Sequence, residues 1–149
     1  MKNKFKSKGG FTLIEMLVVM AAFGFILAIT VLSYNNIRNN IVLNNNGFEI
    51  ANALREAQSR SIVSKNNQVH GVHFNSADYI LYDGHWPDIT SQTAYSFSQG
   101  INIYSGEGIS VEFMRLTGGA VQAEEIVIGT TSGNQKTIRI AASGRISIE

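Results

Sequence analysis

The feature that most restricts the fold of this chain is a long uncharged stretch near its N-terminus. From Met16 to Ile37 the sequence has no charged residue, and from Met16 to Leu32 only Thr30 is polar. A helix over Phe11–Leu32 would be roughly 30 Å long, about the hydrocarbon thickness of a bilayer. Helices of soluble domains rarely carry apolar residues on every face over such a length. The stretch therefore predicts a transmembrane helix.

The segment before this stretch is basic and ends in glycine. Four lysines alternate with other residues up to Lys8, and Gly9 and Gly10 follow. Secretory signals are cut beyond their apolar segment, whereas here the processing site, after Gly10, precedes it. Cutting there would leave the apolar helix on the mature chain. The alternative, a signal peptide lost on export, would need a small-residue site near Ala28 or Ser33, where the sequence is a poor match.

Charge is distributed unevenly along the chain. The formal net charge is +1, but without the four leader lysines eight basic residues face eleven acidic ones, a net charge of about −3. That balance does not favour general polyanion binding, and lysines beside an apolar helix mark its cytoplasmic side. Cysteine is absent from the sequence, which excludes disulfides and thiolate metal sites. The length fits one domain plus an anchoring helix.

One acidic residue, Glu15, lies in the first turn of the expected helix. A carboxylate near the hydrocarbon costs about 2.5–3.5 kcal/mol on insertion scales, a cost that leucine would avoid. Cleavage after Gly10 would create an ammonium group on Phe11, one helical turn away. We therefore expect Glu15 to pair with an N-terminal amine. The alternative is an acid beside the membrane without a partner.

Type IV pilins and type II secretion pseudopilins have a class III leader that resembles the run Lys8-Gly9-Gly10-Phe11-Thr12-Leu13-Ile14-Glu15. Gly10, Phe11 and Glu15 match that motif residue by residue. The resemblance implies that a prepilin peptidase cuts between Gly10 and Phe11 and that Phe11 is N-methylated. It also implies that Glu15 attracts the terminal amine of a neighbouring subunit during filament assembly.

The same resemblance implies where the protein works and with what. It predicts a single-pass protein of the cytoplasmic (inner) membrane, surrounded by lipid before assembly, with its globular domain outside the cytoplasm. Its partners would be other pilins or pseudopilins and the inner-membrane assembly platform. Many major pilins carry a helix-breaking proline early in the mature helix, whereas this region contains none and only Gly24 could loosen the helix. That difference favours a minor pilin or pseudopilin.

The rest of the chain predicts an α+β fold. The helix is expected to continue with a kink or short break at Asn44-Asn45-Asn46-Gly47, followed by a second half from Phe48 to about Lys65. From Gln68 onward, short runs rich in β-branched and aromatic residues predict consecutive antiparallel strands, and Asp83–Ser98 is expected to be irregular. The expected strands are Val69–Phe74, Tyr79–Tyr82, Ile101–Tyr104, Ser110–Met114, Glu125–Ile128, Thr137–Ala141 and Arg145–Ile148.

These elements divide the chain into a leader at 1–10, a transmembrane and filament-core helix at 11–40, and a globular domain at 41–149. We expect the second helical half to pack on an antiparallel β-sheet or small β-sandwich. The stretch Ala53–Ile62 before the first strand, and the closing Ser143-Gly144-Arg145-Ile146, resemble the GspH/FimT-like minor pseudopilin branch.

The histidines do not predict a metal site. On a strand, His70 and His73 would point to opposite faces, so they cannot chelate one ion, and both are expected at the sheet surface. His85 has no fixed relation to either. The sequence therefore predicts no bound metal.

The carboxylates and glycines do not predict catalysis. Glu124 and Glu125 would point apart on their strand, while Glu107 and Asp83 are expected in turns, so no acid–base pair is favoured. The glycine-rich turns lack the Gly-Lys-Ser/Thr of a phosphate loop, and no serine lies in a Gly-x-Ser-x-Gly elbow. We therefore expect neither enzymatic activity nor a cofactor.

A small basic patch could form from Lys136, Arg139 and Arg145, but the acidic mature chain and the nearby Glu149 favour solvated surface cations over DNA contact. Two functions remain open. The first is a structural subunit of a type IV pilus, competence pili included, or of a secretion pseudopilus. The second is a membrane-tethered binding module, DNA-contacting in competence uptake, that does not polymerise.

Overall fold

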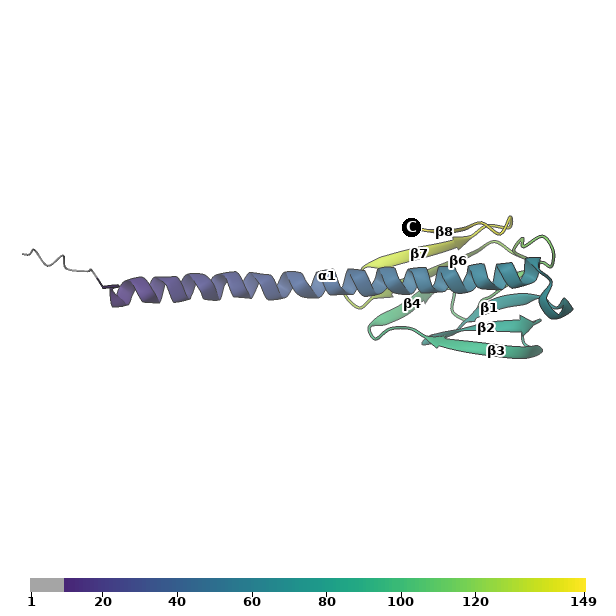
Figure 1. Ribbon diagram of the computed structural model, residues 1–149, viewed down its shortest axis with the longest axis horizontal. Coiled ribbons are helices and arrows are strands. Elements are labelled where there is room, and N and C mark those ends of the chain that lie inside the picture. Colours follow the sequence, from purple (N-terminus) through teal and green to yellow (C-terminus); the bar gives the residue numbers. More distant parts are fainter. Residues whose placement is uncertain (1–9) are drawn as a thin grey trace, which may run out of the picture. The chain divides into compact units, whose positions relative to one another are not determined.

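The computed structural model describes residues 10–149, apart from the side chains of residues 30–36. Nine of the ten predicted leader residues, and part of the predicted transmembrane segment, therefore lie outside the described residues. The chain divides into two compact units, residues 1–37 and 38–149. Helix α1, Leu13–Ile62, contributes residues to both (Figure 1).

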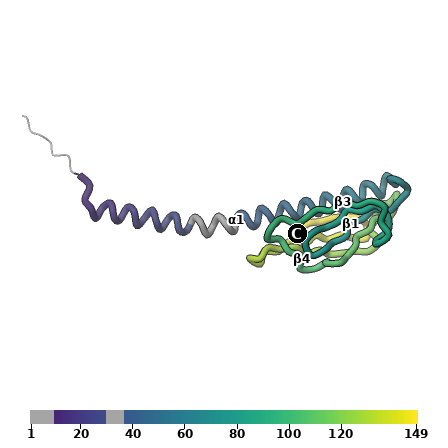
Figure 2. Tube along the Cα trace, turned by 90° about the horizontal axis from the view of Figure 1, so that it is seen from below, coloured from purple at the N-terminus to yellow at the C-terminus, as the bar shows by residue number. Residues whose placement is uncertain are grey.

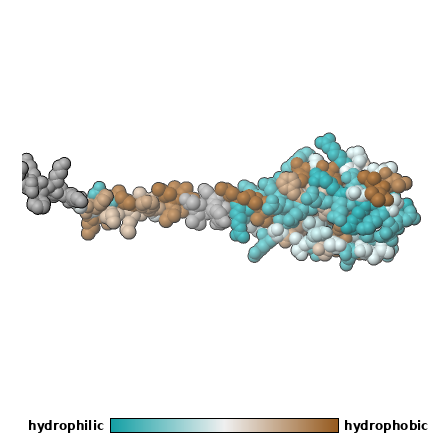
Figure 3. Space-filling model, in the orientation of Figure 1, coloured by the Kyte–Doolittle hydropathy of each residue, from teal (hydrophilic) through white to brown (hydrophobic). Residues whose placement is uncertain are grey.

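The first unit contains the apolar half of α1. Every large apolar side chain between positions 11 and 29 is exposed, with exposed fractions from 43% for Val19 to 84% for Leu13. Figure 3 shows this apolar surface. Among the residues that the structure describes, no helix meets the length and apolarity required to cross a membrane.

In the second unit, α1 has one buried face. Ile50, Ala51, Leu54 and Ala57 are fully buried, at the spacing expected for a helix that covers a core. Figure 2 shows this part of the helix lying along the strands. The prediction that the second helical half packs on antiparallel strands is therefore confirmed.

The predicted break at Asn44-Asn45-Asn46-Gly47 is wrong, because α1 runs through this segment without interruption. Asn46 is buried; its Nδ2 donates to the carbonyl oxygen of Val42 at 2.8 Å, and its Oδ1 accepts from the backbone N–H of Ser98 at 3.0 Å. Asn44 accepts a hydrogen bond from Lys136 Nζ at 2.7 Å. Tertiary hydrogen bonds thus outweigh the low helix propensity of asparagine.

The helix ends at Ile62, about three residues earlier than the sequence suggests. The chain then reverses through a 3₁₀ turn, Lys65–Asn67. Ser64, just before the turn, and Asn66 and Asn67 within it have positive φ angles. Asparagine tolerates this left-handed conformation better than most residues. Lys65-Asn66-Asn67 therefore form the turn that follows the helix, and they are not part of the helix itself.

Eight antiparallel strands form two four-stranded sheets, with strand orders β3-β2-β1-β5 (sheet A) and β4-β6-β7-β8 (sheet B). The α+β class and the antiparallel arrangement are as predicted. The strands are β1 His70–Phe74, β2 Asp78–Gly84, β3 Ile89–Ser96, β4 Ile101–Ser105, β5 Ser110–Phe113, β6 Glu124–Thr130, β7 Gln135–Ile140 and β8 Ile146–Ile148.

The prediction that Asp83–Ser98 is irregular is wrong. Asp83 and Gly84 belong to β2, and Ile89–Ser96 forms β3, which pairs with β2. Residues of β3 are exposed or half-buried on both faces, so the strand lacks the alternation of apolar and polar residues that identifies a half-buried strand. It lies at the edge of sheet A, where backbone pairing with one neighbour is sufficient.

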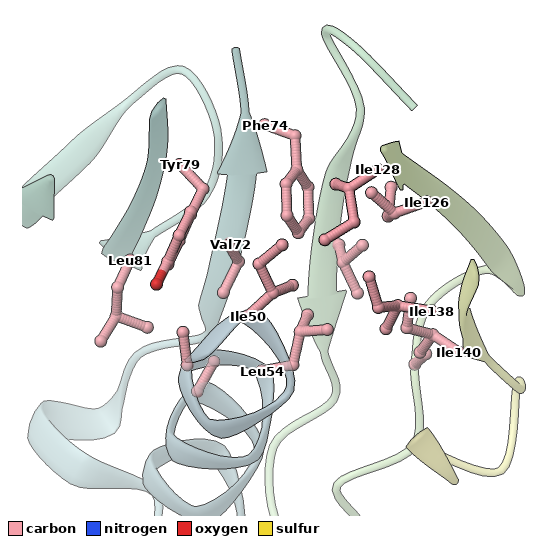
Figure 4. Packing of buried hydrophobic residues seen from close by; sticks show 14 of the residues in the cluster. Ile50, Leu54, Val72, Phe74, Tyr79, Leu81, Ile126, Ile128, Ile138 and Ile140 are labelled. Atoms are coloured by element: carbon pink, nitrogen blue, oxygen red, sulfur yellow. The ribbon is translucent and has the colours of Figure 1, made fainter. Parts of the chain in front are cut away.

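The core lies where α1 meets the two sheets. Figure 4 shows Ile50 and Leu54 of the helix between Val72 and Phe74 of sheet A and the isoleucines of sheet B. These side chains belong to one buried cluster. Burial of a leucine or isoleucine contributes about 1.5–3 kcal/mol, so the second half of α1 and both sheets depend on one another for stability.

Candidate functional site

The start of α1 carries a reciprocal helix cap. The Oγ1 of Thr12 accepts a hydrogen bond from the backbone N–H of Glu15 at 3.3 Å, and the Glu15 carboxylate accepts from the backbone N–H of Thr12 at 3.4 Å. This is the capping box of a Thr-x-x-Glu sequence, which satisfies two N–H groups that the helix leaves unpaired. Glu15 therefore has a local role in addition to the predicted intermolecular one.

Gly10 and Phe11 precede the helix, outside regular secondary structure, and both are exposed. A Cβ atom placed on Gly10 would meet nothing within 4 Å. The described part of the chain thus leaves the peptide bond between Gly10 and Phe11 open to an external protein. Glycine at this position is not required by packing within the chain.

A buried ionic cluster joins the end of α1 to β1 and β2. His70 is fully buried; its Nδ1 lies 2.7 Å from Oδ1 of Asp83 and its Nε2 lies 3.1 Å from the carbonyl oxygen of Lys65. Arg60 contacts the same Asp83 oxygen at 3.2 Å and Glu56 at 2.6 Å.

The charges around Asp83 favour its ionised form. Burial alone would raise the pKa of Asp83, but the hydrogen bond and charge of His70, followed by those of Arg60, outweigh burial and lower that pKa. Among the described residues, no buried side-chain nitrogen or oxygen lacks a hydrogen-bond partner. The cluster is therefore a satisfied structural network.

His73 faces the opposite side of β1 from the core. Its ring stacks on Trp86 with centroids 3.8 Å apart, and its Nδ1 lies 2.8 Å from the Oγ of Ser110. Burial lowers the pKa of His73, which favours the neutral ring. The serine–histidine contact lies beneath Trp86, and the pair is part of the packing on the outer face of sheet A.

Glu112 holds the Trp86 loop on this face. Its carboxylate accepts from the backbone N–H of Trp86 at 2.9 Å and from the hydroxyl of Tyr82 at 3.1 Å, and it lies 3.1 Å from Nδ1 of His85. The prediction that His70 and His73 lie at the sheet surface is wrong, because the ionic cluster covers one and Trp86 covers the other. Asp83 lies in β2 and not in a turn.

Metal ligands do not gather in the part of the chain that the structure describes: it contains no group of three or more histidine, aspartate and glutamate side chains placed to hold an ion. His70 and His73 lie on opposite faces of β1, as the strand alternation predicts. Each ring is engaged with its own neighbours.

Of the three proposed DNA-contacting cations, the structure separates one from the other two. Lys136 shares a face of β7 with the buried Ile138 and hydrogen-bonds Asn44 on α1. Arg139 lies on the opposite face between two carboxylates, 3.0 Å from Glu125 and 2.7 Å from Glu149. Arg145 lines the same surface groove as Arg139. Arg139 thus has its charge balanced before any phosphate approaches.

One of these features could have been found in the sequence. The Thr12-x-x-Glu15 spacing is a helix-start signature, but the apolar run that follows draws attention to the membrane instead. The pairing of His70 with Asp83 depends on the β1–β2 register, and no spacing rule predicts that register.

Two comparisons with known proteins bear on this arrangement. Residues 5–31 match the family model of the prokaryotic N-terminal methylation motif. The fold is similar to that of the minor pseudopilin EpsH from the type 2 secretion system of Vibrio cholerae, with a TM-score of 0.54 and 11% identity over 72% of this chain and 95% of that one. The start of the chain thus matches a methylation motif, and its fold is similar to that of a minor pseudopilin. No curated protein matches the sequence significantly.

For a pilin-like chain, the structure divides the candidate functional residues into two groups. Gly10, Phe11 and Glu15 are exposed at the end of the chain that the methylation motif covers. The histidine, carboxylate and tryptophan clusters of the domain are internally satisfied and hold its elements together.

Proposed function

We propose that this chain is a minor pilin or pseudopilin, a structural subunit that a prepilin peptidase cuts after Gly10 and that then assembles into a type IV pilus or a type II secretion pseudopilus. Its N-terminal helix would cross the cytoplasmic membrane once, with the folded domain outside, until an assembly platform extracts it into a filament. There it would pack beside the helices of other pilins or pseudopilins.

One observation carries this proposal: the first half of α1 exposes large apolar side chains, while its second half belongs to the folded domain. Exposed fractions between 43% and 84% on the large side chains at positions 11–29 leave much apolar surface in water. Contiguous exposed apolar surface of this size marks a membrane or protein contact. Lipid before assembly, and neighbouring helices after it, would cover the same side chains.

Glu15 would have two partners in succession. In the separate chain it caps α1 together with Thr12. In a filament, the amine of Phe11 on a neighbouring subunit would provide a stronger, charge-assisted partner in a medium of low dielectric constant. The two roles need different chemistry, because an amide can complete a capping box but cannot supply a negative charge.

Processing is tested by mass spectrometry of the native polypeptide. We expect a chain that begins at N-methylated Phe11. A chain that retains its first ten residues would instead support the membrane-tethered module that does not polymerise. Gly10→Ala serves as a matched control of the cut, because no described neighbour restricts the added methyl group. The variant should fold normally but remain uncut.

The pairing role of Glu15 is tested by two variants in a strain that lacks the wild-type chain. Glu15→Gln keeps a capping side chain and removes the charge, whereas Thr12→Ala removes the cap and keeps the charge. We expect Glu15→Gln to insert in the membrane but to be lost from isolated filaments, and Thr12→Ala to be incorporated. Normal incorporation of Glu15→Gln would exclude charge pairing.

A further inference from the structure

Sheet A has one long free edge, formed by β3. This strand pairs only with β2, as the outermost strand of the sheet (Figure 1). At its end, the N–H of Phe97 donates to the carbonyl oxygen of Ala77 at 3.0 Å. Alternation along an antiparallel ladder then turns the N–H and C=O groups of Gln92, Ala94 and Ser96 away from β2, toward the free side.

Nothing along this edge blocks pairing with another chain. Proteins protect exposed edges with charges, prolines, bulges or very short strands. Residues Ile89–Ser96 contain no charged residue and no proline, and the register irregularity lies at one end, near Gly84. The part from Ser91 to Ser96 is regular. It is therefore a ready site for the addition of a strand.

A groove of about 370 Å³ runs beside this edge, between β3 and α1. The helix contributes Glu49, Asn52, Ala53 and Glu56, and the sheet contributes Tyr79, Tyr95 and Ser96. The rings of Tyr79 and Tyr95 stack with centroids 5.3 Å apart. Burial, and then the nearby charge of Glu49, raise the pKa of Tyr79 to about 12. A strand added to β3 would direct every second side chain toward this groove.

The groove carries negative charge that the chain does not balance. Within the described residues, Glu49 makes no ion pair or hydrogen bond. Glu56 forms an ion pair with Arg60, but Arg60 also forms an ion pair with Asp83. Arg55 donates to Asn52, one of the lining residues, at 3.2 Å. A cation entering the groove would meet the Glu49 carboxylate and the exposed face of Tyr95.

We propose that the free edge of β3 binds an extended segment of another polypeptide that carries lysine or arginine at alternate positions. The backbone of the segment adds a fifth strand to sheet A, through the outward groups of Gln92, Ala94 and Ser96. Its inward basic side chains lie against Glu49 and the Tyr79–Tyr95 stack. This surface belongs to the domain and does not depend on the N-terminal motif, so it can fail or succeed independently of filament assembly.

The test uses the full chain in a neutral detergent and a short synthetic peptide that alternates lysine with threonine and valine. Binding is measured by fluorescence anisotropy of the labelled peptide, and amide exchange is followed by NMR. We expect saturable, salt-sensitive binding and slower exchange at Gln92, Ala94 and Ser96. A matched peptide with glutamate at the lysine positions should not bind. Equal binding of both peptides, or binding of neither, would overturn the proposal.

Two substitutions separate the backbone and charge contributions. Ala94→Pro removes an outward N–H without removing a bond to β2, and should weaken binding about tenfold or more. Ala94→Val, which keeps the N–H, should bind as the original chain does. Glu49→Gln should weaken binding roughly two- to fivefold. If Ala94→Pro does not fold, Ser96→Pro replaces it, and unchanged binding by a folded proline variant contradicts the proposal.

Discussion

The two halves of α1 have the same backbone conformation and opposite relations to the rest of the chain. Between positions 13 and 29, large apolar side chains are exposed, whereas Ile50 and Leu54 farther along are fully buried. The first half is apolar on every side, and the second has one apolar face and a polar remainder. The distribution of apolar residues along a helix, and not its backbone conformation, thus indicates which of its faces are buried.

The comparison also locates the stability of the molecule. The second half shares a core with both sheets, so its side chains contribute to the free energy of unfolding of the domain. The large apolar side chains of the first half are exposed, so they make no comparable contribution. Substitutions in the two halves should therefore separate domain stability from assembly.

The largest expected effect is that of Leu54→Ala. Because Leu54 is fully buried between the sheets, its truncation should lower the free energy of unfolding by about 3–5 kcal/mol. Urea unfolding of the chain in neutral detergent, followed by the fluorescence of Trp86, measures this. Leu17→Ala is the matched control in the first half, with 57% of Leu17 exposed. An equal loss in both variants would remove the distinction between the halves.

A smaller loss is expected where the second half ends, at the buried ionic cluster. Asp83→Asn removes a charge that His70 and Arg60 share and should lower the free energy of unfolding by about 2–3 kcal/mol at pH 7. Because the folded-state pKa of Asp83 is lowered, its contribution is present above the unfolded value and is lost as the pH falls through the folded value.

The difference between the original chain and Asp83→Asn should therefore stay constant from pH 7 to about pH 5 and shrink below about pH 4. Urea unfolding at each pH measures the difference. Asp88→Asn, at an exposed position before β3, is a control that should change little. A difference that grows toward acid pH would mean that the Asp83 carboxylate is not the stabilising form.

The sequence predicts both halves of α1 as helical, the first from a continuous apolar run and the second from one apolar face. It also locates seven of the strands, since they are rich in β-branched and aromatic residues. It fails at β3, whose sequence has no buried face, and at Asn44-Asn45-Asn46-Gly47. Those positions are decided by partners distant in the sequence, such as Ser98 for Asn46. Local propensity cannot include such partners.

The candidate functional residues divide in the same way. Gly10, Phe11 and Glu15 are predicted from the sequence, because their motif is defined by spacing along the chain. The contacts of His70 and His73 are missed, because they depend on a strand register and on a loop that folds back through Trp86. The edge of β3 is missed for the same reason, since an edge exists only once the strand order is known.

The Asn46 contacts provide a test of the continuous helix. Asn46→Ala leaves the N–H of Ser98 without its acceptor and should lower the free energy of unfolding by about 1–2 kcal/mol. Asn45→Ala, at an exposed neighbouring position, should have no such cost and should gain slightly from the higher helix propensity of alanine. Urea unfolding of both variants measures this. Equal effects on the free energy of unfolding would mean that Asn46 acts only through its helix propensity.

The smallest expected effect lies at the other end of the helix, at the capping box. Thr12→Ala removes the side chain that accepts from the backbone N–H of Glu15 and should destabilise the first turn by about 0.5–1 kcal/mol. Because the two units have separate packing, the loss should appear as faster amide exchange in the first turn, with no change in the unfolding of the domain. Glu15→Gln, which can still complete the cap, should leave that exchange nearly unchanged. Faster exchange at Leu54 in Thr12→Ala would mean that the two halves of the helix unfold together, and the contrast between them would then be one of surface chemistry alone.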